Sequence, residues 1–70
     1  MEKIAIDTEF IKVDSLLKFA AAVGTGGEAK IVINGGDVFV NGEVCTQRGK
    51  KLHPGDKVDF QGMSFEVVKG

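Results

Sequence analysis

Apolar and polar residues alternate at the start of the chain. Ile4 and Ile6 are each flanked by polar or small residues, and this period of two is typical of a half-buried strand. We therefore expect a short first strand here. The next segment, Glu9–Val13, is ambiguous and is expected to be extended.

A helical pattern follows. Asp14 is placed to cap a helix over Ser15–Val23, because aspartate at this position can accept the hydrogen bonds of free backbone amides. Ser15, Lys18 and Ala22 would lie on the polar side of this helix. Its apolar face would be formed by Leu16, Leu17, Phe19, Ala20 and Val23.

A second helix is predicted after a glycine-rich turn. Thr25 and Glu28 have the spacing of a capping box, and the pair Gly35-Gly36 can end a helix because glycine adopts the left-handed conformation. These signals predict a helix from Gly26 to about Asn34. The β-branched run Ile31-Val32-Ile33 favours a strand instead, so that alternative stays open.

The second half of the chain has the pattern of antiparallel strands. Val38–Val40, the turn Asn41-Gly42 and Glu43–Cys45 predict a β-hairpin with a two-residue turn. A basic loop, Thr46–Lys51, then leads to Leu52 and to a turn at Pro54-Gly55-Asp56. Two strands end the chain, Lys57–Phe60 and Met63–Val68, and a turn at Gln61-Gly62 joins them. In the first of these strands Val58 and Phe60 should share one face. In the second, Met63, Phe65 and Val67 should do so. The elements predict an α+β fold in which two helices pack on a small, mainly antiparallel sheet.

Composition agrees with one small globular unit. The chain has 70 residues, of which 43% are hydrophobic and 27% charged, so we expect residues 1–70 to form a single domain. With one cysteine, Cys45, and one histidine, His53, neither a disulfide nor a zinc site is expected. The longest apolar stretch, Phe19–Val23, is far shorter than the roughly 20 residues that cross a bilayer. We expect a cytoplasmic protein with no membrane partner.

Charge is unevenly distributed along the chain. The net charge is −1, but residues 44–70 carry five basic and three acidic residues, whereas the first 43 carry four and seven. Most of the excess positive charge lies between Arg48 and Lys57 and could form a local cationic patch. Within it, the loop residues Arg48, Lys50 and Lys51 could bind phosphates. An ordinary solvated loop is the alternative.

The glycine-rich segment Gly24–Ala29 matches the G-x-G-x-x-G/A dinucleotide fingerprint, but it follows a predicted helix instead of a strand, which argues against a Rossmann unit. The amino end of the second helix could instead bind an anion such as an RNA phosphate through the amides of Gly26 and Gly27, with Lys30 one turn away. The alternative is a tight turn between helices.

Two further lysines and the lack of tryptophan and tyrosine refine the expected mode of binding. Lys12 and Lys18 are expected to flank the first helix. The chain has no tryptophan or tyrosine, and its five phenylalanines mostly fall on predicted core faces, so contact with backbone and shape is expected more than base stacking. Cys45 is expected to be a buried hydrophobe, and His53 has no obvious serine or acid partner, so no enzymatic site is expected.

Four segments taken in order resemble the S4-type RNA-binding domain, also called the αL motif: Lys12–Leu17, Gly26–Lys30, Gly36–Val44 and Lys51–Val58. The most specific residues are Glu28-Ala29-Lys30, Gly36, Val38-x-Val40-Asn41-Gly42 and Pro54-Gly55-Asp56. The resemblance covers roughly residues 12–60 and implies a surface for structured RNA, often ribosomal or transfer RNA. It also implies a small stand-alone bacterial member with no fused enzyme.

Together these observations predict a non-catalytic RNA-binding module, monomeric, with RNA and possibly the ribosome as partners and no cofactor, metal or small-molecule substrate. The expected RNA-binding residues are Lys12, Lys18, Gly26, Gly27, Lys30, Arg48, Lys50 and Lys51. A rival resemblance, to the β-grasp sulfur carriers, rests on Val38–Val44, Pro54–Phe60 and Gly70. In that family a C-terminal Gly-Gly carboxylate carries the sulfur, whereas this chain ends Val68-Lys69-Gly70.

Overall fold

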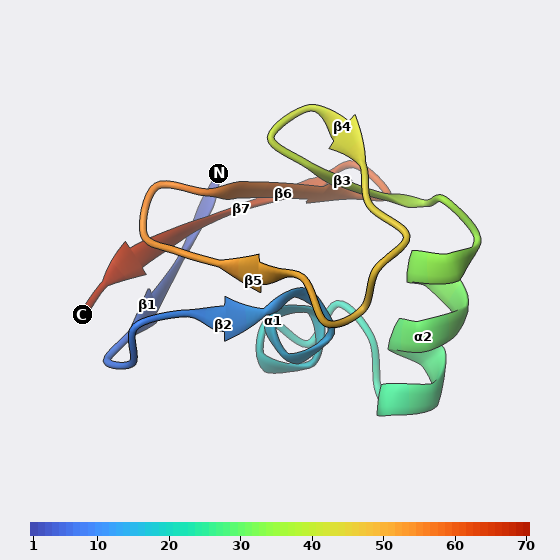
Figure 1. Ribbon diagram of the computed structural model, residues 1–70, viewed down its shortest axis with the longest axis horizontal. Coiled ribbons are helices and arrows are strands. Elements are labelled where there is room, and N and C mark those ends of the chain that lie inside the picture. The colour runs from blue at the N-terminus through green and yellow to red at the C-terminus, as the bar shows by residue number, and fades with distance from the viewer.

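The computed structural model describes residues 1–70 and contains two helices and seven strands (Figure 1). The elements are β1 (Glu2–Ile6), β2 (Ile11–Lys12), α1 (Val13–Phe19), α2 (Gly26–Asn34), β3 (Val38–Val40), β4 (Glu43–Val44), β5 (Lys51–Leu52), β6 (Lys57–Phe60) and β7 (Met63–Lys69). The predicted α+β class is confirmed. Neither helix has the length and apolar character of a membrane-crossing segment.

Five strands form the main sheet in the order β1-β7-β6-β3-β4. All neighbours are antiparallel except β1 and β7, which pair in parallel with Ile4 opposite Val67. The parallel pair was not predicted, because no local pattern reports which distant strand an N-terminal strand will join. The two predicted turns are confirmed: Asn41 and Gly42 have φ of 52° and 86°, and Gln61 and Gly62 have φ of 50° and 79°, as in primed hairpin turns.

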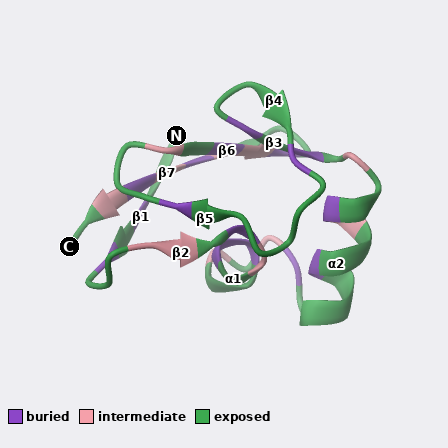
Figure 2. Cartoon of the chain, in the orientation of Figure 1, coloured by how far each residue is buried: buried purple, intermediate pink, exposed green.

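The core lies between one face of this sheet and the two helices (Figure 2). Alternation in the strands places Val38, Val40, Val58 and Phe60 toward the helices. Phe65 and Val67 are buried as predicted, whereas Met63 remains 38% exposed at the start of β7. The buried residues are Ile4, Ile6, Val13, Leu16, Leu17, Val23, Ala29, Ile33, Val38, Val40, Cys45, Leu52, Val58, Phe60, Phe65 and Val67.

Helix α2 has the predicted bounds. The Thr25 hydroxyl accepts a hydrogen bond from the Glu28 amide at 3.1 Å, while the Glu28 carboxylate accepts from the Gly24 amide at 2.7 Å. At the other end Gly36 has φ +80°, and the amides of Gly36 and Asp37 donate to the carbonyls of Ile33 and Val32, which is a Schellman ending. These end signals outweigh the strand preference of the β-branched run.

Helix α1 differs from the prediction at both ends. It begins at Val13, two residues before the predicted start. Its N-cap is Lys12 and not Asp14, and the Lys12 side chain makes no capping hydrogen bond. The amides of Val13 and Asp14 donate instead to the carbonyls of Lys50, at 3.0 Å, and Arg48, at 3.3 Å. The helix ends at Phe19, because Ala21 turns into the left-handed region with φ 59°.

A second, two-stranded sheet lies beside α1. We call it the β2–β5 ribbon; in it Ile11 pairs with Leu52 and Lys12 with Lys51. Leu52 is fully buried and Ile11 is half-buried against the core. The predicted extended segment Glu9–Val13 is confirmed at Ile11 and Lys12, whereas Val13 already belongs to α1. Lys51 belongs to a strand and not to the predicted loop. The ribbon and both helices lie on the same side of the main sheet (Figure 1).

Candidate nucleic-acid interface

The outer face of the β2–β5 ribbon brings two predicted cations together. Lys12 and Lys51 are direct cross-strand partners, and side chains of such partners leave the same face with Cβ atoms about 4.5–5.5 Å apart. Both residues are exposed. Two ammonium groups placed in this way repel each other, so the pair forms a local positive surface that an anion would stabilise.

The basic loop is attached to the start of α1 through its backbone. Its carbonyls at Arg48 and Lys50 accept the first two amides of the helix, which holds the loop beside Lys12. The Arg48 side chain lies 3.7 Å from the Asp14 carboxylate and remains half exposed. Its charge is therefore partly offset by Asp14, and the expected patch is weaker at this residue than a count of basic residues suggests.

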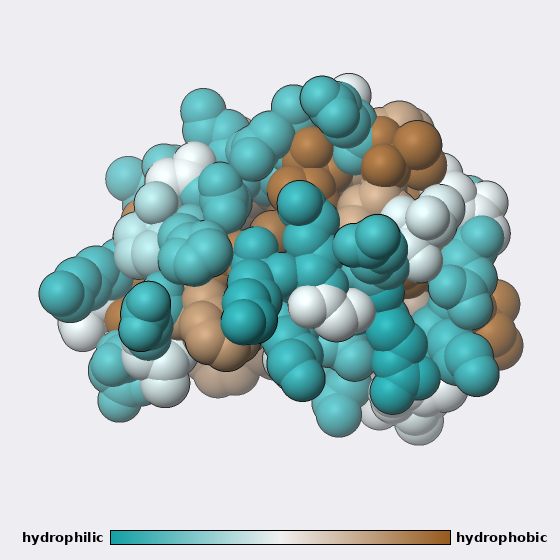
Figure 3. Space-filling model, in the orientation of Figure 1, coloured by the Kyte–Doolittle hydropathy of each residue, from teal (hydrophilic) through white to brown (hydrophobic).

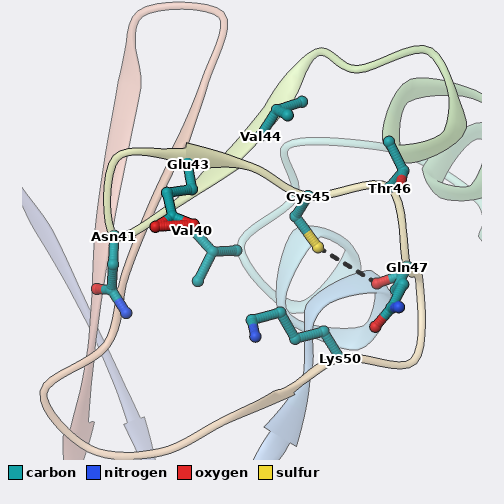
Figure 4. A pocket seen from close by; sticks show the side chains of 8 residues that line it. All are labelled: Val40, Asn41, Glu43, Val44, Cys45, Thr46, Gln47 and Lys50. Atoms are coloured by element: carbon teal, nitrogen blue, oxygen red, sulfur yellow. Dashed lines mark hydrogen bonds between the residues drawn. The ribbon is translucent and has the colours of Figure 1, made fainter.

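Lys50 points away from the outer face of the ribbon, on which Lys12 and Lys51 lie. Its side chain enters a cleft of about 370 Å³ between the β3–β4 hairpin and the loop before β5 (Figure 4). Glu43 and Asn41 line the same cleft, and the buried Cys45 thiol donates to the Gln47 carbonyl at 3.4 Å. Lys50 is thus separated from the Lys12–Lys51 pair although it is next to Lys51 in sequence.

The amino end of α2 forms a second group. The Lys18 ammonium lies close to Gly26, 3.9 Å from the point that a Cβ on Gly26 would occupy. The amides of Gly26 and Gly27 donate no hydrogen bond to the protein, so they remain available to an anion. The Glu28 carboxylate at the same turn adds a negative charge that opposes this role.

Helix α1 separates the Lys12–Lys51 pair from the group at the amino end of α2. Lys12 precedes it and Lys18 lies in its last turn, so the two residues are about 9 Å apart along the helix at 1.5 Å per residue. Lys30 is exposed on α2, and no ion pair joins its side chain to the ribbon. The face in front of β5 and its preceding loop is largely hydrophilic (Figure 3).

The predicted turn at Pro54-Gly55-Asp56, before β6, is fixed by the side chain of Asp56. Its carboxylate accepts from the His53 amide at 2.8 Å and from the Asn41 side chain at 3.1 Å. The Asn41 side-chain oxygen also accepts from the Lys57 amide at 2.9 Å. The His53 hydrogen bond and then that of Asn41 hold the pKa of Asp56 below its ordinary value. Asn41 and Asp56 therefore join the hairpin to the turn that follows the ribbon.

Two aromatic residues on the ribbon were missed as site residues. Phe10 lies with its ring centroid 6.2 Å from that of His53, and the Lys51 ammonium lies 4.8 Å from the Phe10 centroid. The expectation that His53 has no acid partner is wrong, because its Nδ1 lies 3.9 Å from the Asp56 carboxylate. Alternation from Lys12 and Lys51 could have placed both rings on the ribbon face, had the ribbon itself been predicted. No group of three potential metal ligands comes together in the structure.

Comparison with known proteins agrees with this architecture. Residues 4–68 match the family described as "S4 domain". The chain is 44% identical over 66 residues, covering 93% of both chains, to "Probable ribosome maturation protein RlbA" of Bacillus subtilis (strain 168). It is 38% identical over 58 residues, covering 83% of both chains, to "Putative RNA-binding protein YbcJ" of Escherichia coli (strain K12). These matches give no support to the sulfur-carrier alternative. They show that the chain belongs to the S4 domain family.

Proposed function

We propose that this protein binds structured RNA through backbone phosphates and shape. The observation that carries the proposal is the Lys12–Lys51 pair, since two exposed cations placed directly opposite each other cost stability that a bound phosphate would recover. Membership of the S4 domain family supports it. So do the names of two relatives, "Probable ribosome maturation protein RlbA" and "Putative RNA-binding protein YbcJ".

Each predicted site residue has a role in this proposal. Lys12 and Lys51 form the central phosphate contact, and Arg48 adds positive charge from the attached loop. Lys50 adds its charge away from that contact, at the cleft beside the β3–β4 hairpin. Lys18, with the free amides of Gly26 and Gly27, forms a second contact at the amino end of α2, and Lys30 extends that contact along the helix. A rigid RNA helix could bridge the two groups, because its phosphates recur at fixed spacing along a shape the protein can match.

The proposal includes four finer points. Residues 1–70 act as one unit and as a monomer, in the cytoplasm, on ribosomal or transfer RNA. The protein acts by binding and not by catalysis, because the ribbon and the α2 terminus offer cations and amides but no nucleophile with an adjacent base.

Binding to a structured ribosomal RNA fragment across a salt series tests the proposal. We expect the logarithm of the association constant to fall linearly with the logarithm of salt concentration, since phosphate contacts release counterions. A DNA duplex of the same length should bind more weakly, because its grooves and phosphate spacing differ from those of A-form RNA. A flat salt plot would show that phosphates are not the source of affinity.

A further inference from the structure

The outer face of the β2–β5 ribbon carries two aromatic rings beside its two lysines. Extending the strand register by one residue places Phe10 opposite His53, next to Lys12 opposite Lys51. The 6.2 Å centroid distance and the 51° angle between the rings agree with this placement. We call the side of the ribbon that carries these four residues the ribbon face; Ile11 and Leu52 lie on the other side, toward the core.

His53 is held in place on this face, although its side chain is 55% exposed. Its amide donates to Asp56, Phe10 supports its ring, and Pro54 restricts its backbone to extended conformations. An imidazole positioned in this way offers an open flat surface at little further cost in conformational freedom. Core packing does not explain the arrangement, because the exposed ring contributes little to the buried core.

The position of Lys51 relates the rings to phosphate binding. Its ammonium lies 4.8 Å from the Phe10 centroid. The attraction between this cation and the ring stabilises the ammonium on the ribbon face despite the repulsion from Lys12. A nucleotide has a flat base about one sugar away from its phosphate. The ribbon face offers a ring on which the base could stack, beside cations that could bind the phosphate.

We propose that the ribbon face binds an unpaired nucleotide of the RNA, with its base stacked on the His53 ring, which Phe10 supports, and its phosphate held by Lys12 and Lys51. Bases that are not paired are the ones that proteins stack on aromatic side chains, including histidine. The inference rests on the proposed RNA-binding function and adds to it the kind of RNA that binds best, a helix interrupted by a bulge or ending in a loop.

Three hairpin RNAs test this inference: one fully paired, one with a single bulged adenosine, and one with an abasic residue at the bulge. We expect the wild-type protein to prefer the bulged adenosine over the abasic bulge by about 5- to 140-fold, the range for stacking of one base. His53→Ala should abolish that preference, and His53→Phe should retain it, because phenylalanine keeps the flat surface. Phe39→Ala removes an exposed ring on the opposite face of the sheet and should leave the preference unchanged.

The outcomes separate this inference from the function on which it rests. If the wild-type protein binds all three RNAs with salt-dependent but equal affinity, RNA binding stands and base stacking on the ribbon face is overturned. If His53→Ala weakens all three equally, the ring acts on the fold or the charge and the inference is again overturned. If none of the RNAs binds, the proposed function itself is contradicted. Thermal unfolding of each variant, followed by circular dichroism, tests whether the fold is retained.

Discussion

Two residues in the left-handed backbone region end the two helices, and only one of them is glycine. Ala21 follows α1 with φ 59°, and Gly36 follows α2 with φ +80°. Both occupy the same position of a Schellman ending, since the amides of Ala21 and Ala22 donate to the carbonyls of Lys18 and Leu17. The end of α2 was predictable from its glycine, whereas nothing in the run of alanines indicated the end of α1.

This difference predicts opposite effects from exchanging the two residues. Ala21→Gly should raise the free energy of unfolding by about 1 kcal/mol, because the left-handed conformation costs a side chain about that much. Gly36→Ala should lower it by a similar amount; a Cβ there would meet Val44 at an ordinary 3.7 Å, so backbone strain alone would act. Urea unfolding measures both, and a change of the same sign in the two variants would contradict this account.

Asp56 makes stability depend on pH. Its hydrogen bonds hold the folded pKa below the ordinary value, so its contribution is complete above about pH 4 and is lost as the pH falls through the lower, folded pKa. Asp56→Asn should cost about 1–2 kcal/mol at neutral pH, and its deficit relative to wild type should shrink below about pH 4. Thermal unfolding at several pH values measures this. Asp7→Asn, at an exposed aspartate without a side-chain hydrogen bond, is the control. If the loss of stability in Asp56→Asn does not change with pH, the negative charge of Asp56 does not stabilise the fold.

The elements that the sequence predicted well are those whose signals are local. Helix α2 and the β3–β4 hairpin carry their start, stop and turn residues within a few positions. The bounds of α2 and β3 agree with the structure, and β4 ends at Val44, one residue before the predicted end. Helix α1 begins earlier than predicted because its first amides are bound by carbonyls of the basic loop, more than 30 residues away. The ribbon was missed as a pair for the same reason, since its two short strands meet only in the folded chain. The candidate site was therefore predicted as a set of cations, without its rings and without the position of Lys50.

The like-charge pair on the ribbon predicts a conflict between stability and binding. Lys51→Glu would place a carboxylate opposite Lys12 and should raise the free energy of unfolding by about 0.2–1 kcal/mol relative to Lys51→Gln. Both variants lose the contact with Phe10, so the comparison isolates the cross-strand charge. RNA affinity should fall in both and further in Lys51→Glu. Urea unfolding and RNA titration measure the two effects; a less stable Lys51→Glu would show that the lysines are not close enough to repel.

Charge at the scale of the whole molecule is divided between two faces. The open face of the main sheet carries Lys3 and Lys57, each a cross-strand partner of Glu66, so its positive charges alternate with a negative one. The ribbon face has paired lysines without an acidic partner between them. A net charge of −1 is therefore compatible with a local surface that attracts phosphates.

Comparing two double variants with the same net charge tests the central claim most directly. Lys12→Gln with Lys51→Gln should reduce the slope of the salt plot for structured RNA by about 1.5, since each lost phosphate contact removes roughly 0.7–0.9. Lys3→Gln with Lys57→Gln should leave the slope unchanged. Equal slopes for the two double variants, or a larger loss from the sheet pair, would contradict the claim that RNA docks on the ribbon face.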